Sequence, residues 1–427
     1  MAEPSPTPNE PAAANPYAPP AEPAPGAGPA TSARPLIPIF IIVFIDVMGL
    51  TLIIPILPFY ALKFGATPLT ATLLLSVFAF FQLFSGPFLG AWSDRAGRRI
   101  VLLTSQLGMV ASYVVLGVAG ILHLPPAQAL AMVFGGRIIA GITSGNLSVA
   151  QAYISDVTKP EERTKAFGFF GIAFGLGFVL GPVIATGLTA LGSEAAPFFG
   201  SAVLSAASFV ATAVMLPNAK PTAGGGRRAP TFDLFRRAEP RRRLLQFFVY
   251  NLSFSTFMGG FALYLHGKFE WNARQSAYMF VYSGFLGAII QGGFLGRLNR
   301  RLGETRLALL GFVTMAIGNA LLGWIPSWPW LLVIAAIAGF GSTVTRPALT
   351  TLLTKSVGRD EQGKALGMSS TLASLSQIVG PPAAGWLIER RHLGAYGVIV
   401  ASLAALGAVL IALPSSPPAG DGAAPPS

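Results

Sequence analysis

The stretch Gly90-Ala91-Trp92-Ser93-Asp94-Arg95-Ala96-Gly97-Arg98-Arg99 lies between two hydrophobic runs that are each long enough to cross a bilayer. It places an acid four residues after one glycine and three arginines around a second glycine. A short charged turn of this kind suits the connection of two membrane-spanning helices, on the side of the membrane where arginine-rich loops are retained. The stretch therefore predicts a membrane protein.

The composition of the whole chain agrees with this prediction. Hydrophobic residues make up 52% of the sequence and charged residues only 11%, whereas a soluble domain has about 25% charged residues. So little charge cannot cover a soluble surface of this size. Apolar stretches of about 20 residues predict twelve spans, near residues 36–60, 69–92, 100–122, 128–153, 165–190, 196–216, 243–266, 274–296, 306–325, 328–352, 364–388 and 394–413.

The 29 lysines and arginines separate by loop. With the N-terminus inside, 22 lie in cytoplasmic segments, five lie in outer loops, and Arg137 and Arg346 lie inside spans. Because cationic loops stay in the cytoplasm, both termini are predicted to be cytoplasmic. The net charge of +12 is then a topology signal, and no nucleic-acid partner is expected. The chain has no cysteine and three distant histidines, so no metal site is expected either.

Segments outside the spans define the predicted domain organisation. Residues 1–33 and 414–427 are rich in Pro, Ala, Ser and Gly and are expected to be disordered cytoplasmic tails. Residues 217–242 are polar and basic, and they are predicted to be a cytoplasmic linker between six-helix bundles at 34–216 and 243–413. An alternative role for this linker is to bind anionic lipid headgroups.

The two predicted bundles repeat one another. One set of residues recurs with a shift of 206 and a second set with a shift of 199. The first set is Gly90, Arg95 and Gly97, matching Gly296, Arg301 and Gly303; the second is Lys165, Gly168, Gly181 and Pro182, matching Lys364, Gly367, Gly380 and Pro381. Two pseudo-symmetric bundles of this kind can rock against each other around a site at the middle of the membrane.

Several motifs resemble a known family. The loop has the form G-x-x-x-D-R-x-G-R-R, the first span has D-x-x-G from Asp46 followed by P-x-L-P, and the fifth has G-x-x-x-G-P at Gly177, Gly181 and Pro182. Over roughly residues 36–413 the chain resembles the major facilitator superfamily, and within it the drug:proton antiporters of the tetracycline-efflux type. Arg137-Ile-Ile-Ala-Gly is similar to the R-x-x-Q-G of that group, with alanine in place of glutamine. Asn319 is the polar residue of span nine, where tetracycline exporters have an acid.

The resemblance implies a proton-coupled exporter that moves small lipophilic or cationic drug-like compounds by alternating access. We expect a monomer in a bacterial inner membrane, driven by the proton gradient without a cofactor. A sugar or metabolite transporter and a non-transporting scaffold or receptor are the alternatives. No nucleotide-binding loop, nucleophile motif or metal cluster is found, so no enzymatic activity is expected.

The same resemblance gives the charged loop a conformational role. The switch residues are Gly90, Asp94, Arg95, Gly97, Arg98 and Arg99. In the family, the acid of this loop lies near the start of helix 11, where the helix dipole favours a carboxylate, so Asp94 is expected to latch the cytoplasmic side. The alternative is a turn that only fixes topology.

Ionisable residues deep in a membrane are candidate functional residues, because burying a charge there costs about 2.5–3.5 kcal/mol. Asp46 lies about 15 Å from the inner end of its span and Arg137 about 14 Å from the outer end of its span, at 1.5 Å per residue. The two residues could therefore meet. We expect Asp46 to carry the proton, because burial favours the neutral acid and a nearby cation favours the carboxylate. The alternatives are a neutral, hydrogen-bonded structural aspartate, and an arginine that acts as a conformational clamp.

Aromatic and polar residues of other spans are candidates for the cargo site. Apolar walls with a few polar groups suit lipophilic compounds, although a lipid-facing stripe explains the aromatic residues equally well. The predicted cavity residues are Asn146, Tyr250, Asn251, Phe254, Arg346 and Gln377. Arg346 lies close enough to the end of its span to extend toward water. The identity of the cargo is left open.

Overall fold

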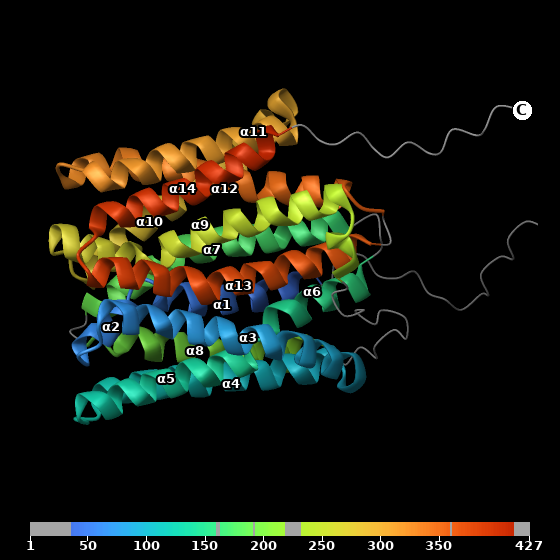
Figure 1. Cartoon of the computed structure of the whole chain (residues 1–427). Coiled ribbons are helices and arrows are strands. Elements are labelled where there is room, and N and C mark those ends of the chain that lie inside the picture. The colour runs from blue at the N-terminus through green and yellow to red at the C-terminus, as the bar shows by residue number, and fades with distance from the viewer. Residues whose placement is uncertain (1–35, 159–162, 191–192, 218–231, 359–360, 414–427) are drawn as a thin grey trace, which may run out of the picture. The chain divides into compact units, whose positions relative to one another are not determined.

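A computed structural model describes residues 36–158, 163–190, 193–217, 232–358 and 361–413, and these residues contain helices and turns but no strand. The predicted tails 1–33 and 414–427 and residues 218–231 of the linker lie outside the described residues. In chain order (Figure 1) the helices are α1 (Leu36–Ile53), α2 (Leu57–Lys63), α3 (Pro68–Ala96), α4 (Arg98–Ile121), α5 (Pro126–Thr143), α6 (Asn146–Val157), α7 (Arg163–Ala190), α8 (Ala196–Met215), η1 (Phe232–Phe235), α9 (Ala238–Phe269), α10 (Ala273–Ile289), η2 (Ile290–Phe294), α11 (Leu295–Leu321), η3 (Leu322–Trp324), α12 (Trp328–Lys355), α13 (Gln362–Glu389) and α14 (Leu393–Ala412).

These helices account for the twelve predicted spans. Seven helical segments of the described residues are long and apolar enough to cross a membrane by themselves, and α1 with α2 would add an eighth as one bent span. The predicted all-α membrane fold is therefore confirmed. The predicted start of the second bundle is less accurate, because α9 begins at Ala238 and takes in the end of the predicted linker.

Local sequence explains where spans bend or turn. The first span breaks between α1 and α2 with a bend of 40°, next to Pro55, which has no backbone N–H to donate. The fourth span is interrupted between α5 and α6. Spans eight and nine form one helical run that turns at Gly303, which has a φ of 72°. Gly97, at the same position of the first repeat, has a φ of 97°. Both turns therefore favour glycine.

The helices have two ends, and each has a turn that contains a glycine with a positive φ. The Gly97 end carries the Gly97 and Gly303 turns, and the Gly65 end carries the turn between α2 and α3. The N-terminal bundle is α1–α8 and the C-terminal bundle is α9–α14. The main contacts between the bundles are made by α3 with α13 and by α7 with α10, and α3 and α13 lie side by side in Figure 1.

Among the residues that the structure describes, the two bundles share a hydrophobic core toward the Gly65 end. The cluster there joins residues of α2, such as Tyr60, to residues of α9 and α13, such as Phe261 and Leu387. Toward the Gly97 end the clusters are separate. One is formed by α1, α3, α4, α6 and α7, and two others are formed by helices of the C-terminal bundle, one of them together with η1.

The α3–α13 contact shows the same difference along its length. A Cβ atom added at Gly385, near the Gly65 end, would lie 2.1 Å from Thr72 Oγ1. Gly367 lies 18 residues, or five turns, earlier on the same face of α13, and no heavy atom lies within 4 Å of its added Cβ. Ser76 Oγ donates to the Gln377 backbone oxygen over 3.4 Å between these levels. The bundles are therefore in close contact at one end and separate at the other.

Candidate functional site

Asp46 lies on α1, about 15 Å along that helix from its first residue at 1.5 Å per residue. Its side chain is held by neutral groups. Asn146 Nδ2, at the start of α6, donates to Asp46 Oδ2 over 2.8 Å. Ser208 of α8 and Gln106 of α4 also lie close to the carboxyl group. Asp46 is half-buried, so an acid at the middle of the membrane remains reachable.

The other members of this network bind one another. Gln106 Nε2 donates to Ser208 Oγ over 2.8 Å, and Ser208 Oγ lies 3.3 Å from the backbone oxygen of Ile42, one turn before Asp46. Gln106 and Ser208 are both fully buried. Neither residue was predicted to belong to the site, although polar residues within apolar spans are candidates for functional sites.

Arg137 lies on α5 and is buried, with 3% of its surface exposed. Its Nε donates to the Leu74 backbone oxygen over 3.2 Å, and its guanidinium lies 4.4 Å from the centre of the Phe78 ring. Nη1 has no hydrogen-bond partner among the described residues. An arginine in this position is held by α3 through a carbonyl and an aromatic face.

Asp46 and Arg137 do not form an ion pair within the described residues. The fully buried Tyr113 of α4 lies near both residues. The structure therefore brings the two predicted residues into one region of the N-terminal bundle without direct contact. Tyr113 is a third ionisable group of that region, which the sequence analysis missed.

The charged loop joins helix ends within the N-terminal bundle. Arg98, whose side chain is 9% exposed, forms an ion pair with Asp94, and its Nε lies 2.9 Å from Asp156 Oδ2 at the end of α6. Arg98 Nη1 also donates to Ser93 Oγ over 2.6 Å. Arg99 donates to the Ala213 backbone oxygen of α8.

Three further switch residues have open surroundings. Arg95 is exposed, Gly97 forms the turn, and no heavy atom lies within 4 Å of a Cβ added at Gly90. In this structure Asp94 therefore pairs with Arg98 inside its own bundle. The predicted latch on the eleventh span, which is α13 in this structure, stays a prediction. Asp156 is a partner that the sequence analysis did not identify, and its signal is an acid at the end of a span that ends beside this loop.

The predicted antiporter motif packs α7 against α1, the helix that carries Asp46. Thr51 Oγ1 donates to the Gly177 backbone oxygen over 2.7 Å. A Cβ atom would lie 2.6 Å from Val47 Cγ1 if added at Gly177, and 2.1 Å from Thr51 Oγ1 if added at Gly181. Pro182 is buried beside them. Glycine is needed at both positions because the two helices approach each other so closely.

The predicted cavity residues fall into separate groups. Tyr250 and Phe254 stack with ring centroids 6.0 Å apart, Tyr250 donates to the Ser342 backbone oxygen over 3.0 Å, and the exposed Arg346 interacts electrostatically with Tyr250. Asn251 donates to the Phe247 backbone oxygen of its own helix over 2.7 Å.

The remaining two cavity candidates lie elsewhere. Asn146 belongs to the Asp46 network, and Gln377 is an exposed residue at the contact of α13 with α3. A single cavity that contains all six residues thus stays a prediction.

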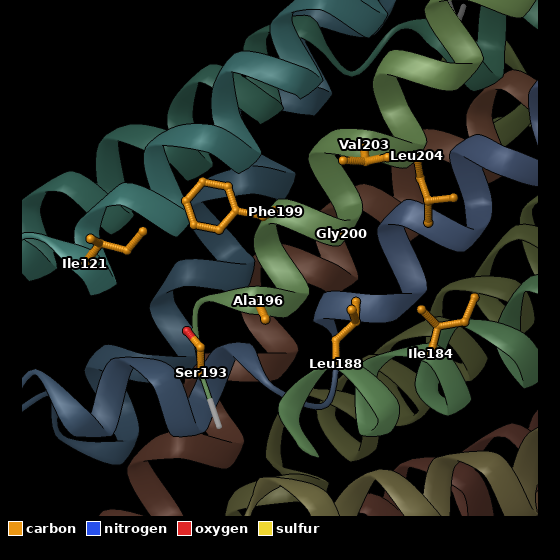
Figure 2. A pocket seen from close by; sticks show the side chains of 9 residues that line it. All are labelled: Ile121, Ile184, Leu188, Ser193, Ala196, Phe199, Gly200, Val203 and Leu204. Carbon is orange, nitrogen blue, oxygen red and sulfur yellow. The ribbon is translucent and has the colours of Figure 1, made fainter. Parts of the chain in front are cut away.

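One hollow on the protein has different chemistry. It lies between α4, α7 and α8 toward the Gly65 end, and side chains such as Ile121, Leu188 and Phe199 line it (Figure 2). No charged residue and none of the predicted site residues is among its lining. Its apolar surface suits contact with lipid chains rather than proton chemistry.

Comparison with known proteins identifies the family. The Major Facilitator Superfamily model matches residues 39–304 and again residues 244–426. The chain belongs to this superfamily. The two overlapping matches agree with the internal repeat.

Curated relatives place the chain near drug-resistance transporters. It is 31% identical over 368 residues to the class C tetracycline resistance protein of Escherichia coli, covering 82% of this chain and 88% of that protein. It is 32% identical over 356 residues to the class G protein of Vibrio anguillarum, covering 80% and 87%. Multidrug resistance protein 2 of Bacillus subtilis (strain 168) is 27% identical over 356 residues, covering 81% and 87%.

Solved structures share the fold. The human organic anion transporter MFSD10 (TETRAN) has a TM-score of 0.66 at 24% identity, covering 88% of this chain and 99% of that chain. A mutant of the nucleoside transporter NupG has a TM-score of 0.71 at 15% identity, covering 88% and 98%. The predicted resemblance to drug:proton antiporters of this superfamily is thus confirmed, and the chain is a multi-pass membrane transporter.

Proposed function

We propose that this protein exports small lipophilic compounds in exchange for protons, and that Asp46 carries the proton. The observation that supports this most strongly is a half-buried carboxyl group at the middle of a membrane span, bound by the Asn146 amide and not by an arginine. An amide and hydroxyl groups can bind either form of the acid. Asp46 can therefore gain and lose a proton while its hydrogen bonds to these neutral groups remain.

The packing of the bundles supports transport by alternating access. Cores that are shared at the Gly65 end and separate at the Gly97 end are the arrangement expected when one bundle rocks against the other. The Gly97 end carries the arginine-rich loop and the basic linker, so the positive-inside rule places it in the cytoplasm. The structure is then an inward-facing state in a bacterial inner membrane, with cytoplasmic termini.

The charged loop has a proposed role in the opposite state. Asp94 lies 18 residues, or five turns, after Ser76 on α3, and so shares the helix face that contacts α13 at Ser76. Closing the Gly97 end would bring this face toward the start of α13 at Gln362. The positive end of that helix dipole would then attract the carboxylate.

The cargo class follows from the neighbouring side chains and from the relatives. Phe254, which is partly exposed and stacks on the buried Tyr250, offers an aromatic surface, and Asp46 offers an acceptor. Relatives described as tetracycline and multidrug resistance proteins support a drug-like compound over a sugar. Lipophilic compounds with or without a positive charge are therefore the proposed cargo.

A flux assay tests this function. The purified protein is reconstituted in liposomes, and a pH gradient is imposed against a panel of fluorescent lipophilic cations, neutral drugs and sugars. We expect gradient-driven movement of lipophilic compounds by the wild type and none by Asp46→Asn, which should remain folded. Gradient-driven sugar movement, or full coupling in Asp46→Asn, would contradict the proposal.

A further inference from the structure

Tyr113 is a buried residue with an unusual hydroxyl group. It lies on α4, seven residues and therefore two turns after Gln106, on the same helix face. Its side chain is fully buried, and its hydroxyl has no hydrogen-bond partner among the described residues. Buried polar groups in proteins are nearly always bonded. An exception beside two ionisable residues calls for a functional explanation.

The position of Tyr113 is fixed by its neighbours. Ser112 Oγ, the preceding residue, donates to the Gly136 backbone oxygen over 2.7 Å. This bond joins α4 to α5 immediately before Arg137. Gln106, at the other end of the same helix face, is bonded to Ser208 and lies close to the Asp46 carboxyl group. Tyr113 therefore lies on a helix that is attached to both ionisable residues.

Charge interactions agree with this placement. Tyr113 interacts electrostatically with Asp46 and with Arg137, and the interaction with Arg137 is mutual. Arg137 Nη1 is also buried and unbonded among the described residues. Asp46, Tyr113 and Arg137 are the titratable groups of the described residues that these interactions connect. Arg137 Nη1 is thus a second buried, unbonded donor, and Tyr113 is the residue that lies within reach of both charges.

We propose that Tyr113 is a positioning residue for proton coupling, whose hydroxyl donates a hydrogen bond to the Asp46 carboxylate after its proton leaves and releases it when the acid is protonated. This inference rests on the proposed role of Asp46. No covalent step is involved, because the phenol keeps its proton in both states. The released hydroxyl is the one seen here.

The test is the pH profile of gradient-driven transport. Tyr113→Phe removes the hydrogen-bond donor and so destabilises the Asp46 carboxylate. The midpoint of the pH profile should therefore move to higher pH by about one unit, a tenfold gain in the proton affinity of Asp46. Tyr60→Phe is the matched control, because the Tyr60 hydroxyl donates to the Leu116 backbone oxygen on the same α4 over 2.6 Å. Its midpoint should stay at the wild-type value.

Two further arms keep the outcomes distinct. Incorporating 3-fluorotyrosine at position 113 keeps the ring and strengthens the donor, so the midpoint should move to lower pH, including in the event that Tyr113→Phe does not fold. If Asp46→Asn abolishes coupling while both Tyr113 variants keep the wild-type midpoint, the Tyr113 inference is overturned alone. If Asp46→Asn remains fully coupled, the proposed function fails first.

Discussion

The two bundles share their packing but not their chemistry. In the N-terminal bundle a Cβ atom added at Gly181 would lie 2.1 Å from Thr51 Oγ1, and in the C-terminal bundle one added at Gly380 would lie 3.0 Å from Thr256 Oγ1. The glycines are related by a shift of 199 and the threonines by 205. The repeat therefore preserves a close helix contact in each bundle.

The two charged residues deep in the spans, Asp46 and Arg137, have no such counterparts. With the shift of 205, Asp46 corresponds to Asn251, whose amide is bonded to its own helix. The stretch Arg137-Ile-Ile-Ala-Gly corresponds, with a shift of 198, to Ala335-Ala-Ile-Ala-Gly. The repeat therefore preserves helix packing in both bundles, whereas the residues proposed for proton coupling lie in the N-terminal bundle alone.

Exchanging the residues of this comparison should have the largest effect. Asp46→Asn should abolish proton release coupled to cargo entry, and adding Asn251→Asp should not restore it, because the second bundle has Ala335 where the first has Arg137. The measurement is proton release by reconstituted protein on cargo addition. Asn251→Ala is the control and should remain coupled. Restored coupling in the exchanged protein would show that either bundle can host the chemistry.

The charged loops give the next largest contrast. Arg98→Gln leaves Asp94 and Asp156 without their shared cation, so we expect a loss of about 1–3 kcal/mol in stability. Thermal unfolding in detergent measures it, and Arg98→Lys should recover part of the loss. An unchanged unfolding temperature would mean that these contacts are loose in solution.

The shared packing predicts equal effects in the two bundles. Gly181→Ala and Gly380→Ala should each destabilise the protein by about 1–3 kcal/mol through overpacking, because each glycine touches the neighbouring helix. Gly367→Ala is the control, since its added methyl group meets nothing within 4 Å. The free energy of unfolding of the three variants would separate these cases. A harmless Gly181→Ala would contradict the close contact.

The smallest effect is expected at Glu304, the counterpart of Arg98 by the shift of 206. The hydrogen bond from Lys355 Nζ, 2.7 Å from Glu304 Oε1, lowers the pKa of the Glu304 carboxyl group below its ordinary value of 4.5. The contact is therefore present above pH 4.5 and is lost as the pH falls through the lowered pKa. Glu304→Gln should leave the unfolding temperature at neutral pH almost unchanged, because exposed pairs contribute little. A large drop in the unfolding temperature would show that the Glu304–Lys355 contact is buried.

The sequence predicted the fold well because its signals are local. The lengths of the apolar stretches predicted the spans. The glycines of the two repeated loops indicated the turns that the structure shows at Gly97 and Gly303. The depths of Asp46 and Arg137 were also predictable from helix rise.

Their partners were not predictable in the same way. Gln106, Ser208 and Tyr113 come from helices distant in the chain, and only packing places them beside Asp46. The pairing of Arg98 with Asp156 has the same cause. The position of a residue along its helix predicts its depth in the membrane and the helix face on which it lies. Which side chains of other helices it contacts depends on how the helices are arranged.

Infrared difference spectroscopy across a pH titration tests the central claim most directly, since it observes the protonation of Asp46 itself. We predict a protonated-carboxyl band that titrates, responds to added cargo, and is missing in Asp46→Asn. A carboxylate that stays ionised at every pH, with or without cargo, would contradict the account.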